Sequence, residues 1–329
     1  MKAKEIGQAV ARWWDSVWFQ RFDPLAVGVF RISLGALLIV YFVALYPNWM
    51  EFFAADGMIS LHDSVPQRPP PDVWTVFYWA DGWISVQVWW WIGMTAVLGF
   101  TLGWQTRFWT ICLFILESSM IYRNPAVVNG EDLVFRVLLF YSCFAPLGAS
   151  LSVDRWLLSR QSETATPREL PMIWAVRLIQ VNIALVYLIS MPYKLTDESG
   201  EWARGDAMYW AMMNDTWAGR LPHHWFYGHR GVFLSVLMTY GTIVIELAFP
   251  LLVWFRKTRL LVLAGITSLH LGIAVIIPNV AFFTLSMVCS FWLFVPADDL
   301  RRWGNGLARA IRRRWDRSDP TKKAKSPLP

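Results

Sequence analysis

The stretch from Tyr187 to Met212 reads YLISMPYKLTDESGEWARGDAMYWAM. It begins as the end of an apolar helix, passes Pro192 and Lys194, and continues as a charged run before it turns apolar again. A lysine at the end of a membrane helix is commonly an interfacial anchor, because its long side chain lets the ammonium group reach water. A lysine that is partly buried can instead lose its proton and act as a base or nucleophile. Both interpretations of Lys194 stay open at this point.

The composition of the whole chain indicates a membrane protein. Of its 329 residues, 56% are hydrophobic and 16% are charged, and the mean hydropathy is +0.36. A soluble domain would have roughly 25% charged residues. The chain also contains 22 tryptophans, a residue that concentrates where a membrane meets water. The sequence therefore predicts an all-α integral membrane protein.

Eight apolar stretches approach the ~20 residues that a helix needs to cross a bilayer. They cover residues 25–46, 84–104, 107–122, 132–148, 171–192, 231–254, 260–277 and 279–296. The third, fourth, seventh and eighth are short, so they are candidates for tilted or re-entrant helices. We therefore predict a polytopic helical bundle of about eight transmembrane helices, within a range of seven to nine.

The loop charges predict the orientation of this bundle, because cytoplasmic loops are richer in lysine and arginine. The bias favours a multi-pass protein of the bacterial inner membrane with both termini in the cytoplasm. The loops that would then face outward cover residues 47–83, 123–131, 193–230 and 277–280.

The same charges suggest three parts of the chain. Residues 1–24 have the pattern of an interfacial amphipathic helix, residues 25–298 form the transmembrane domain, and residues 299–329 form a basic cytoplasmic tail. Most of the net charge of +6 lies in that tail. A membrane flank accounts for such a cluster without nucleic acid, so we expect the lipid bilayer as a partner and no nucleic acid.

Five charged or titratable residues fall inside the predicted spans, where a charge is costly. Arg31 and Arg177 lie at a depth where either could meet Glu117. Glu246 and His270 lie at similar depths on either side of the basic turn FRKTR, so we expect them to pair. Structural ion pairs or hydrogen bonds explain all five residues. His270 can also titrate near neutral pH, which makes it a candidate for proton transfer.

A polar stripe runs along the fifth span towards Lys194. At about 100° per residue, Gln180, Tyr187, Ser190 and Lys194 fall within roughly one quadrant of the helix, whereas Asn182 points elsewhere. This pattern predicts that the face ending in Lys194 looks into the protein and not into lipid.

A second polar motif, RNPAVVNGEDLVFR, covers residues 123–136. Its Asn129-Gly130 dipeptide favours a turn, and Glu131 and Asp132 then stand at the start of a helix, where the dipole stabilises acids. A well-capped turn explains the motif, and a wall of the same cavity is the alternative. The three cysteines lie in apolar spans without metal-ligand spacing, so we expect no metal site.

Several short motifs together resemble one known family. They are LAVGVFRISLG around Arg31, RNP…NGED, SVDRW at 152–156, Lys194-Leu195 followed by Trp202 and Gly205, and the late segment around His270. In this order they are similar to the membrane domain of vitamin K-dependent γ-glutamyl carboxylase and its bacterial relatives, the horizontally transferred transmembrane (HTTM) family. The resemblance covers about residues 20 to 298.

The resemblance implies a function for Lys194, because the lysine of this motif is regarded as part of the vitamin K oxidation site. Three departures separate this chain from the carboxylase. The carboxylase has an Asn-His pair where this chain has Asn129-Gly130, and that histidine is associated with the reaction intermediate. The spacing from Lys194 to Trp202 is longer here, and the large lumenal domain that grips the substrate propeptide has no counterpart. The family therefore implies the fold more directly than the reaction.

Two functional hypotheses follow. The first is a carboxylase- or oxygenase-like enzyme that uses a lipid-soluble quinol, similar to vitamin K, with a peptide or protein as a further candidate substrate. Lys194 would be its base and His270 a second catalytic residue, and the expected substrate-binding residues are Tyr187, Asn129, Glu131, Asp132 and Trp202. The second hypothesis is a non-catalytic membrane partner in the maturation or export of another protein or peptide. A transporter is less favoured, because we find no inverted repeat.

Overall fold

The computed structural model describes residues 2–60, 74–79, 83–161, 171–196, 198–214 and 219–318. Part of the predicted 47–83 loop and the last eleven residues of the predicted tail lie outside these ranges. Within them the chain is helical and contains no β-strand, apart from an isolated bridge between Arg21 and Met172. The prediction of an all-α protein is therefore confirmed for the described chain.

In the described ranges, five helical segments are long and apolar enough to cross a membrane. The first, Leu25–Phe53, comprises α2 (Leu25–Leu45), η1 (Tyr46–Asn48) and α3 (Trp49–Phe53). The others are Ser85–Leu102 in α5 (Trp83–Leu102), α9 (Trp174–Thr196), α12 (Gly228–Leu252) and α13 (Arg259–Ile276). A sixth results if Pro278–Phe294 and the helix after it are counted as one span.

The predicted count of eight is not confirmed, because three of the expected spans fall short. The helix α6 (Thr106–Arg123) has the expected length but is too polar, with Arg107, Glu117 and Arg123 among its residues. The helices α7 (Gly130–Ser142) and α14 (Ala281–Phe291) have 13 and 11 residues. At 1.5 Å per residue they measure about 20 and 16 Å, against a hydrocarbon core of about 30 Å.

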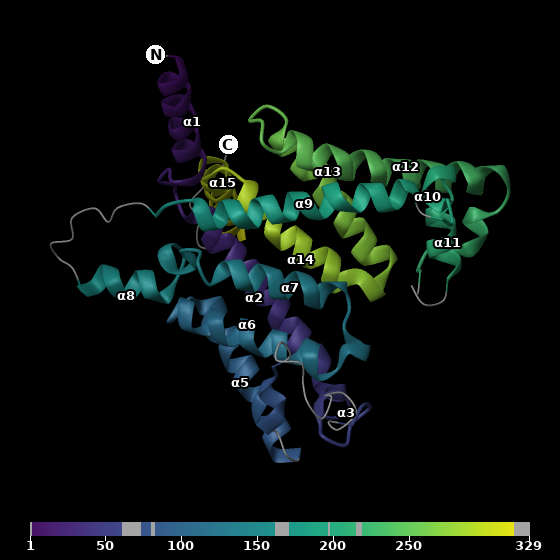
Figure 1. The fold of residues 1–329 in the computed structure, drawn as a ribbon, viewed down its shortest axis with the longest axis horizontal. Coiled ribbons are helices and arrows are strands. Elements are labelled where there is room, and N and C mark those ends of the chain that lie inside the picture. The colour runs from purple at the N-terminus through teal and green to yellow at the C-terminus, as the bar shows by residue number, and fades with distance from the viewer. Residues whose placement is uncertain are drawn as a thin grey trace, which may run out of the picture. The chain divides into compact units, whose positions relative to one another are not determined.

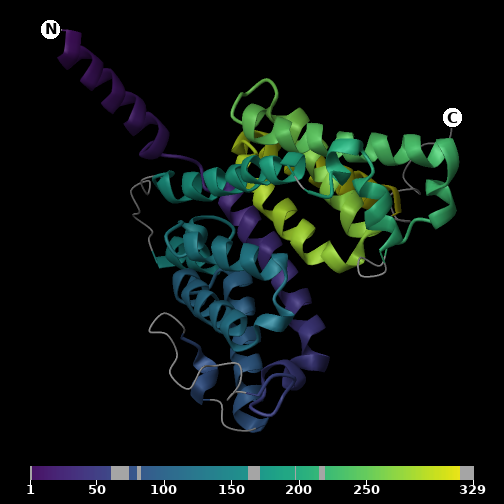
Figure 2. The ribbon, with the colours of Figure 1, turned by 45° about the vertical axis from the view of Figure 1, so that its right-hand side comes forward.

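The short helix α14 lies at the centre of the packing. It contacts α2, α7, α9 and α13, while α2 packs on α5, α5 on α6, and α9 on α12. Figures 1 and 2 show α5, α6 and α7 next to one another, with α9, α12 and α13 grouped on the other side of α14. Residues far apart in the sequence therefore meet around α14.

Glycines let α2 and α5 approach each other closely. A Cβ atom on Gly35 would lie 2.2 Å from the Thr101 hydroxyl, and one on Gly93 would lie 2.3 Å from the Phe42 ring. Small residues at such crossings are a common device of membrane helix packing, because backbones must come together without a hydrophobic driving force.

Two amphipathic helices flank the bundle in the sequence. In α1 (Lys2–Trp18), the exposed apolar residues Ile6, Val10, Trp13 and Trp14 recur at helical spacing. The helix α15 (Ala297–Ser318) belongs to a second compact unit, Val295–Pro329, and its exposed apolar residues are Trp303, Leu307 and Ile311. Both patterns are typical of helices that lie on a membrane surface.

Candidate functional site

Lys194 forms an ion pair inside the bundle. Its ammonium nitrogen donates a hydrogen bond to Oε2 of Glu246 on α12, and the two side chains are only 18% and 10% exposed. The predicted pair between Glu246 and His270 is therefore wrong. The carboxylate of α12 meets α9 and not α13. Depth alone does not fix which neighbouring helix a side chain faces.

Trp202 covers Lys194 from the other side. The lysine nitrogen lies 4.5 Å from the centre of the indole ring, which is the geometry of a cation–π interaction. Trp202 belongs to the short helix α10 (Glu201–Arg204), which stands between Gly200 and Gly205. Both glycines have positive φ angles, 65° and 83°, which residues with a side chain rarely adopt. These two turns fold α10 back over the end of α9.

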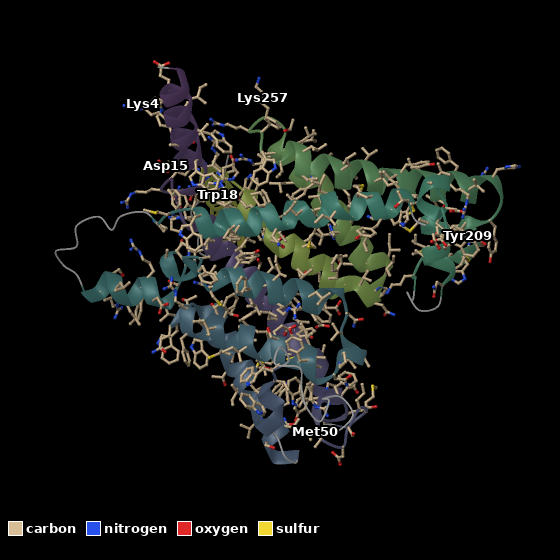
Figure 3. The ribbon with its side chains drawn as sticks, in the orientation of Figure 1. Lys4, Asp15, Trp18, Met50, Tyr209 and Lys257 are labelled. Atoms are coloured by element: carbon tan, nitrogen blue, oxygen red, sulfur yellow. The ribbon has the colours of Figure 1, made fainter. Side chains whose placement is uncertain are left out.

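Hydroxyl groups of α12 hold this returning segment in place. The Tyr240 hydroxyl donates to the carbonyl of Ala203 at 2.7 Å, and the Ser235 hydroxyl donates to the carbonyl of Gly205 at 3.1 Å. The Ser235 hydroxyl also accepts a hydrogen bond from the backbone N–H of Tyr209 on α11 (Ala207–Met213). Tyr209 is labelled in Figure 3. The cover over Lys194 is therefore attached to the same helix that carries Glu246.

A second polar pair lies deeper on the same face of α9. The Tyr187 hydroxyl and Nε2 of His270 are 2.6 Å apart, and each residue is 3% exposed. Phe249 and Phe291 pack against the tyrosine and shield the pair. Nδ1 of His270 has no hydrogen-bond partner. Tyr187 precedes Lys194 by seven residues, so the two pairs are about 10 Å apart along the helix axis.

The polar stripe of α9 faces other parts of the protein, as predicted. Besides Tyr187 and Lys194, the Gln180 amide donates to the carbonyl of Leu293 at 2.6 Å. Asn182 points elsewhere and lines a different cavity. The helical period therefore identified the inward face correctly.

Asn129, Glu131 and Asp132 line a cavity of about 400 Å³, together with Tyr41 and Phe282. Asn129 and Asp132 form a reciprocal capping box, and the Tyr41 hydroxyl donates to Asp132. Burial raises the pKa of the Glu131 carboxyl. The structure thus gives this turn its capping role and also a cavity, but Lys194, Tyr187 and His270 are not among the residues that line it.

One aromatic side chain of α14 lies next to both the capped turn at Asn129 and the Tyr187–His270 pair. A Cβ atom on Gly130 would lie 3.3 Å from the ring of Phe283, and the centre of that ring is 6.4 Å from the centre of the His270 imidazole. The side chain of Phe283 therefore lies next to both the capped turn and the Tyr187–His270 pair. A larger residue at position 130 would have to displace this ring.

The remaining buried charges have structural partners that differ from those expected. Arg31 donates to the carbonyls of Leu147, at 2.9 Å, and Leu151. Arg177 donates to the Gln180 side chain at 2.8 Å. Neither arginine pairs with Glu117, which is 2% exposed and whose Oε1 has no hydrogen-bond partner. Arg31 lies beside Gly103, which precedes the first residue of α6, whereas Glu117 lies in the second half of that helix. The expected meeting of these charges is therefore not observed.

Sequence reasoning missed the residues that hold the outer turn. Arg123 is fully buried and donates to the carbonyls of Phe53, Ala54 and Ile59, and the Asn124 amide donates to the carbonyl of Phe52 at 2.9 Å. These bonds fasten the α6–α7 turn to the segment after α3. The signal was present in the RNP motif, because an arginine followed by a turn dipeptide is well placed to bind backbone carbonyls.

Within the described parts of the chain, no group of three or more histidine, cysteine, aspartate or glutamate side chains could hold an ion. The polar groups near Lys194 are instead single donors and acceptors between apolar helices.

A bundle of apolar helices, with the Lys194–Glu246 ion pair and buried hydrogen bonds between them, defines a polytopic helical membrane protein. The HTTM domain model matches residues 19–299, and the chain belongs to the HTTM family. The predicted membership of the HTTM family is therefore confirmed. No curated protein and no solved structure matches the chain significantly.

Proposed function

We propose that this protein is a quinol-linked, carboxylase-like enzyme of the bacterial inner membrane, with Lys194 as its base. The observation that carries the proposal is the ion pair between Lys194 and Glu246 beneath Trp202. An anchoring lysine would extend its ammonium group into water. Lys194 instead turns into the bundle, where its side chain is 18% exposed.

The ion pair supplies a route to a neutral amine. Removing charges from water is costly, so a partly buried lysine and glutamate can exist as an ion pair or as an amine beside a carboxylic acid. When Glu246 takes the proton of Lys194, the free amine can accept a proton from a quinol hydroxyl. The products are a quinolate anion and an ammonium ion, which compensate each other's charge.

The neighbouring groups suit a ring-shaped, lipid-soluble substrate. Trp202 offers an aromatic face beside the lysine, and Tyr187 with His270 forms a second pair that can exchange a proton. We assign the 400 Å³ cavity at Asn129, Glu131 and Asp132 to the second substrate. Phe283 lies beside both this cavity's turn and His270, which supports the assignment of the cavity and the Tyr187–His270 pair to one reaction.

The location at the outer membrane face is part of the proposal and rests on the charge bias of the loops. The basic turn follows the C-terminal end of α12, whereas the segment that covers Lys194 is bonded to Ser235 and Tyr240, in the N-terminal half and at the middle of that helix. Figure 3 shows the same separation between Lys257, in that turn, and Tyr209 on α11. If the basic turn is cytoplasmic, Lys194 opens towards the outside.

The test uses purified protein in lipid nanodiscs with reduced menaquinone under anaerobic conditions. A quinolate absorbs at longer wavelengths than its quinol, so the wild type should show a red-shifted band. Lys194→Ala should lose the band. Lys194→Arg should lose it as well, because a guanidinium group keeps its charge beside Glu246 but does not act as a base. Arg220→Ala, an exposed residue of the outer segment, is the matched control and should behave as the wild type.

The arginine variant separates the proposal from its alternative. If Lys194→Arg retains the band, a positive charge is sufficient and Lys194 is not the base. If neither the wild type nor any variant shows a band, the pair is a structural tie between α9 and α12. That result would favour the second hypothesis, a non-catalytic membrane partner of another protein or peptide.

A further inference from the structure

A second cavity, of about 480 Å³, lies among α6, α7 and α9. It falls within the size range of known small-molecule sites. Its lining combines aromatic rings with a few polar groups and includes Trp74, Ser118, Tyr122, Arg136, Phe140 and Asn182. None of the residues that the proposed reaction uses lines it.

Arg136 projects a positive charge into this cavity without a protein partner. Among the residues that the structure describes, its guanidinium group makes no hydrogen bond and no ion pair. Arginine has five N–H donors and its charge is permanent, so a half-buried guanidinium in an apolar protein requires compensation.

Two further polar side chains of the lining are also unused. The Ser118 hydroxyl is buried without a hydrogen-bond partner. In the described chain, the Asn182 amide makes no hydrogen bond either, although it lies at the same cavity. Buried polar groups are almost always paired, so the buried Ser118 hydroxyl, next to the half-buried and unpaired Arg136 and Asn182, points to a ligand that carries oxygen atoms.

The rest of the lining fits the apolar part of such a ligand. Ile115 and Phe140 line the cavity and are 37% and 42% exposed, so the cavity opens at the apolar outer surface of the bundle. Arg136 lies six residues after the start of α7, which is about 9 Å along the helix. Trp74 and Tyr122 lie near the same end of α6, and such aromatic residues concentrate at the level of lipid head groups.

We propose that this cavity binds an acidic amphiphile. A carboxylate or phosphate group pairs with Arg136 and accepts hydrogen bonds from Ser118 and Asn182. The hydrocarbon chain lies against the aromatic wall and leaves the cavity past Ile115 and Phe140. A phospholipid and a free fatty acid share this chemistry, and the experiment distinguishes them.

The test is native mass spectrometry of the delipidated full-length protein with added phosphatidylglycerol, oleate or phosphatidylcholine. We expect the wild type to retain phosphatidylglycerol or oleate in preference to phosphatidylcholine, which has no net charge. Retention of phosphatidylglycerol alone identifies a phospholipid site, and retention of oleate alone identifies a fatty-acid site. Arg136→Gln should lower the affinity for the bound lipid about tenfold, because a charge-assisted pair is lost.

Three further variants keep the test decisive. Arg136→Lys retains the charge and should keep most of the affinity. Ser118→Leu fills the cavity without changing any charge and should also weaken binding. Arg107→Gln removes an exposed arginine from the other end of α6 and should have no effect. Equal binding of all three lipids, or unchanged binding by Arg136→Gln and Ser118→Leu, would overturn the proposal.

Discussion

Removing either partner of the Lys194–Glu246 ion pair should destabilise the bundle, whereas removing both should cost much less than the sum of the two single changes. The two side chains are 18% and 10% exposed, so each single change leaves a poorly solvated group behind. Breaking a buried pair costs about 3–5 kcal/mol. Because some water reaches this pair, we expect Lys194→Met to cost about 3 kcal/mol, at the lower end of that range.

The other single variant should cost somewhat less. In Glu246→Gln the lysine loses its carboxylate but keeps its contact with the Trp202 ring. Since a cation–π contact contributes ~0.5–2 kcal/mol, we expect a cost of about 2 kcal/mol. The double variant Lys194→Met/Glu246→Gln has no charge left, and we expect about 2 kcal/mol. The coupling energy is then about 3 kcal/mol.

The measurement is equilibrium unfolding in mixed micelles, followed by the fluorescence of the tryptophans. A second cycle, Glu246→Gln with His270→Gln, provides the comparison, because Glu246 contacts Lys194 and His270 contacts Tyr187. Its two effects should add within about 0.5 kcal/mol. Additivity in the first cycle, or strong coupling in the second, would show that the ion pair has been assigned to the wrong partners.

Three further predictions concern the orientation, the reaction and the outer turn. Alkaline phosphatase fused after Arg220 should be active and fused after Arg313 it should be silent, and the reverse pattern would place Lys194 in the cytoplasm. The isolated protein should not carboxylate glutamyl peptides with reduced vitamin K and labelled bicarbonate, since Gly130 has no side chain to move a proton; label in the peptide above a Lys194→Ala control would contradict this. Gly130→His should destabilise the protein by about 1–3 kcal/mol, because its Cβ would lie 3.3 Å from the Phe283 ring. Phe283→Ala should reduce that penalty, and an equal penalty in both backgrounds would exclude the clash as its cause.

Hydropathy predicted the helical class of the fold but not the number of membrane crossings. The long apolar helices such as α9 and α12 were identified because their mean hydropathy is high, at 1.6 and 1.9. The helices α7 and α14 have similar composition but only 13 and 11 residues. The N-terminus of α7 is set by the Asn129 cap, and that of α14 by the turn at Pro278. Hydropathy does not predict such helix boundaries.

The candidate site could be predicted in part for a similar reason. The helical period placed Tyr187 and Lys194 on one inward face, since it requires only the geometry of a single helix. Their partners depend on how neighbouring helices rotate about their own axes, and a single sequence does not contain that angle. Tyr41 is the clearest example, because it lies in an apolar span and its hydroxyl is used only through Asp132 on another helix.

Two adjacent residues of α14 contact the two parts of the candidate site, the cavity at Asn129 and the Tyr187–His270 pair. Phe282 lines the 400 Å³ cavity, and Phe283 lies beside His270. Because consecutive side chains on a helix are fixed about 100° apart, a rotation of α14 cannot move one ring without moving the other. Close packing makes such elements respond in discrete steps and not by gradual deformation. A ligand that rotated α14 at one of these places would therefore also move the ring at the other.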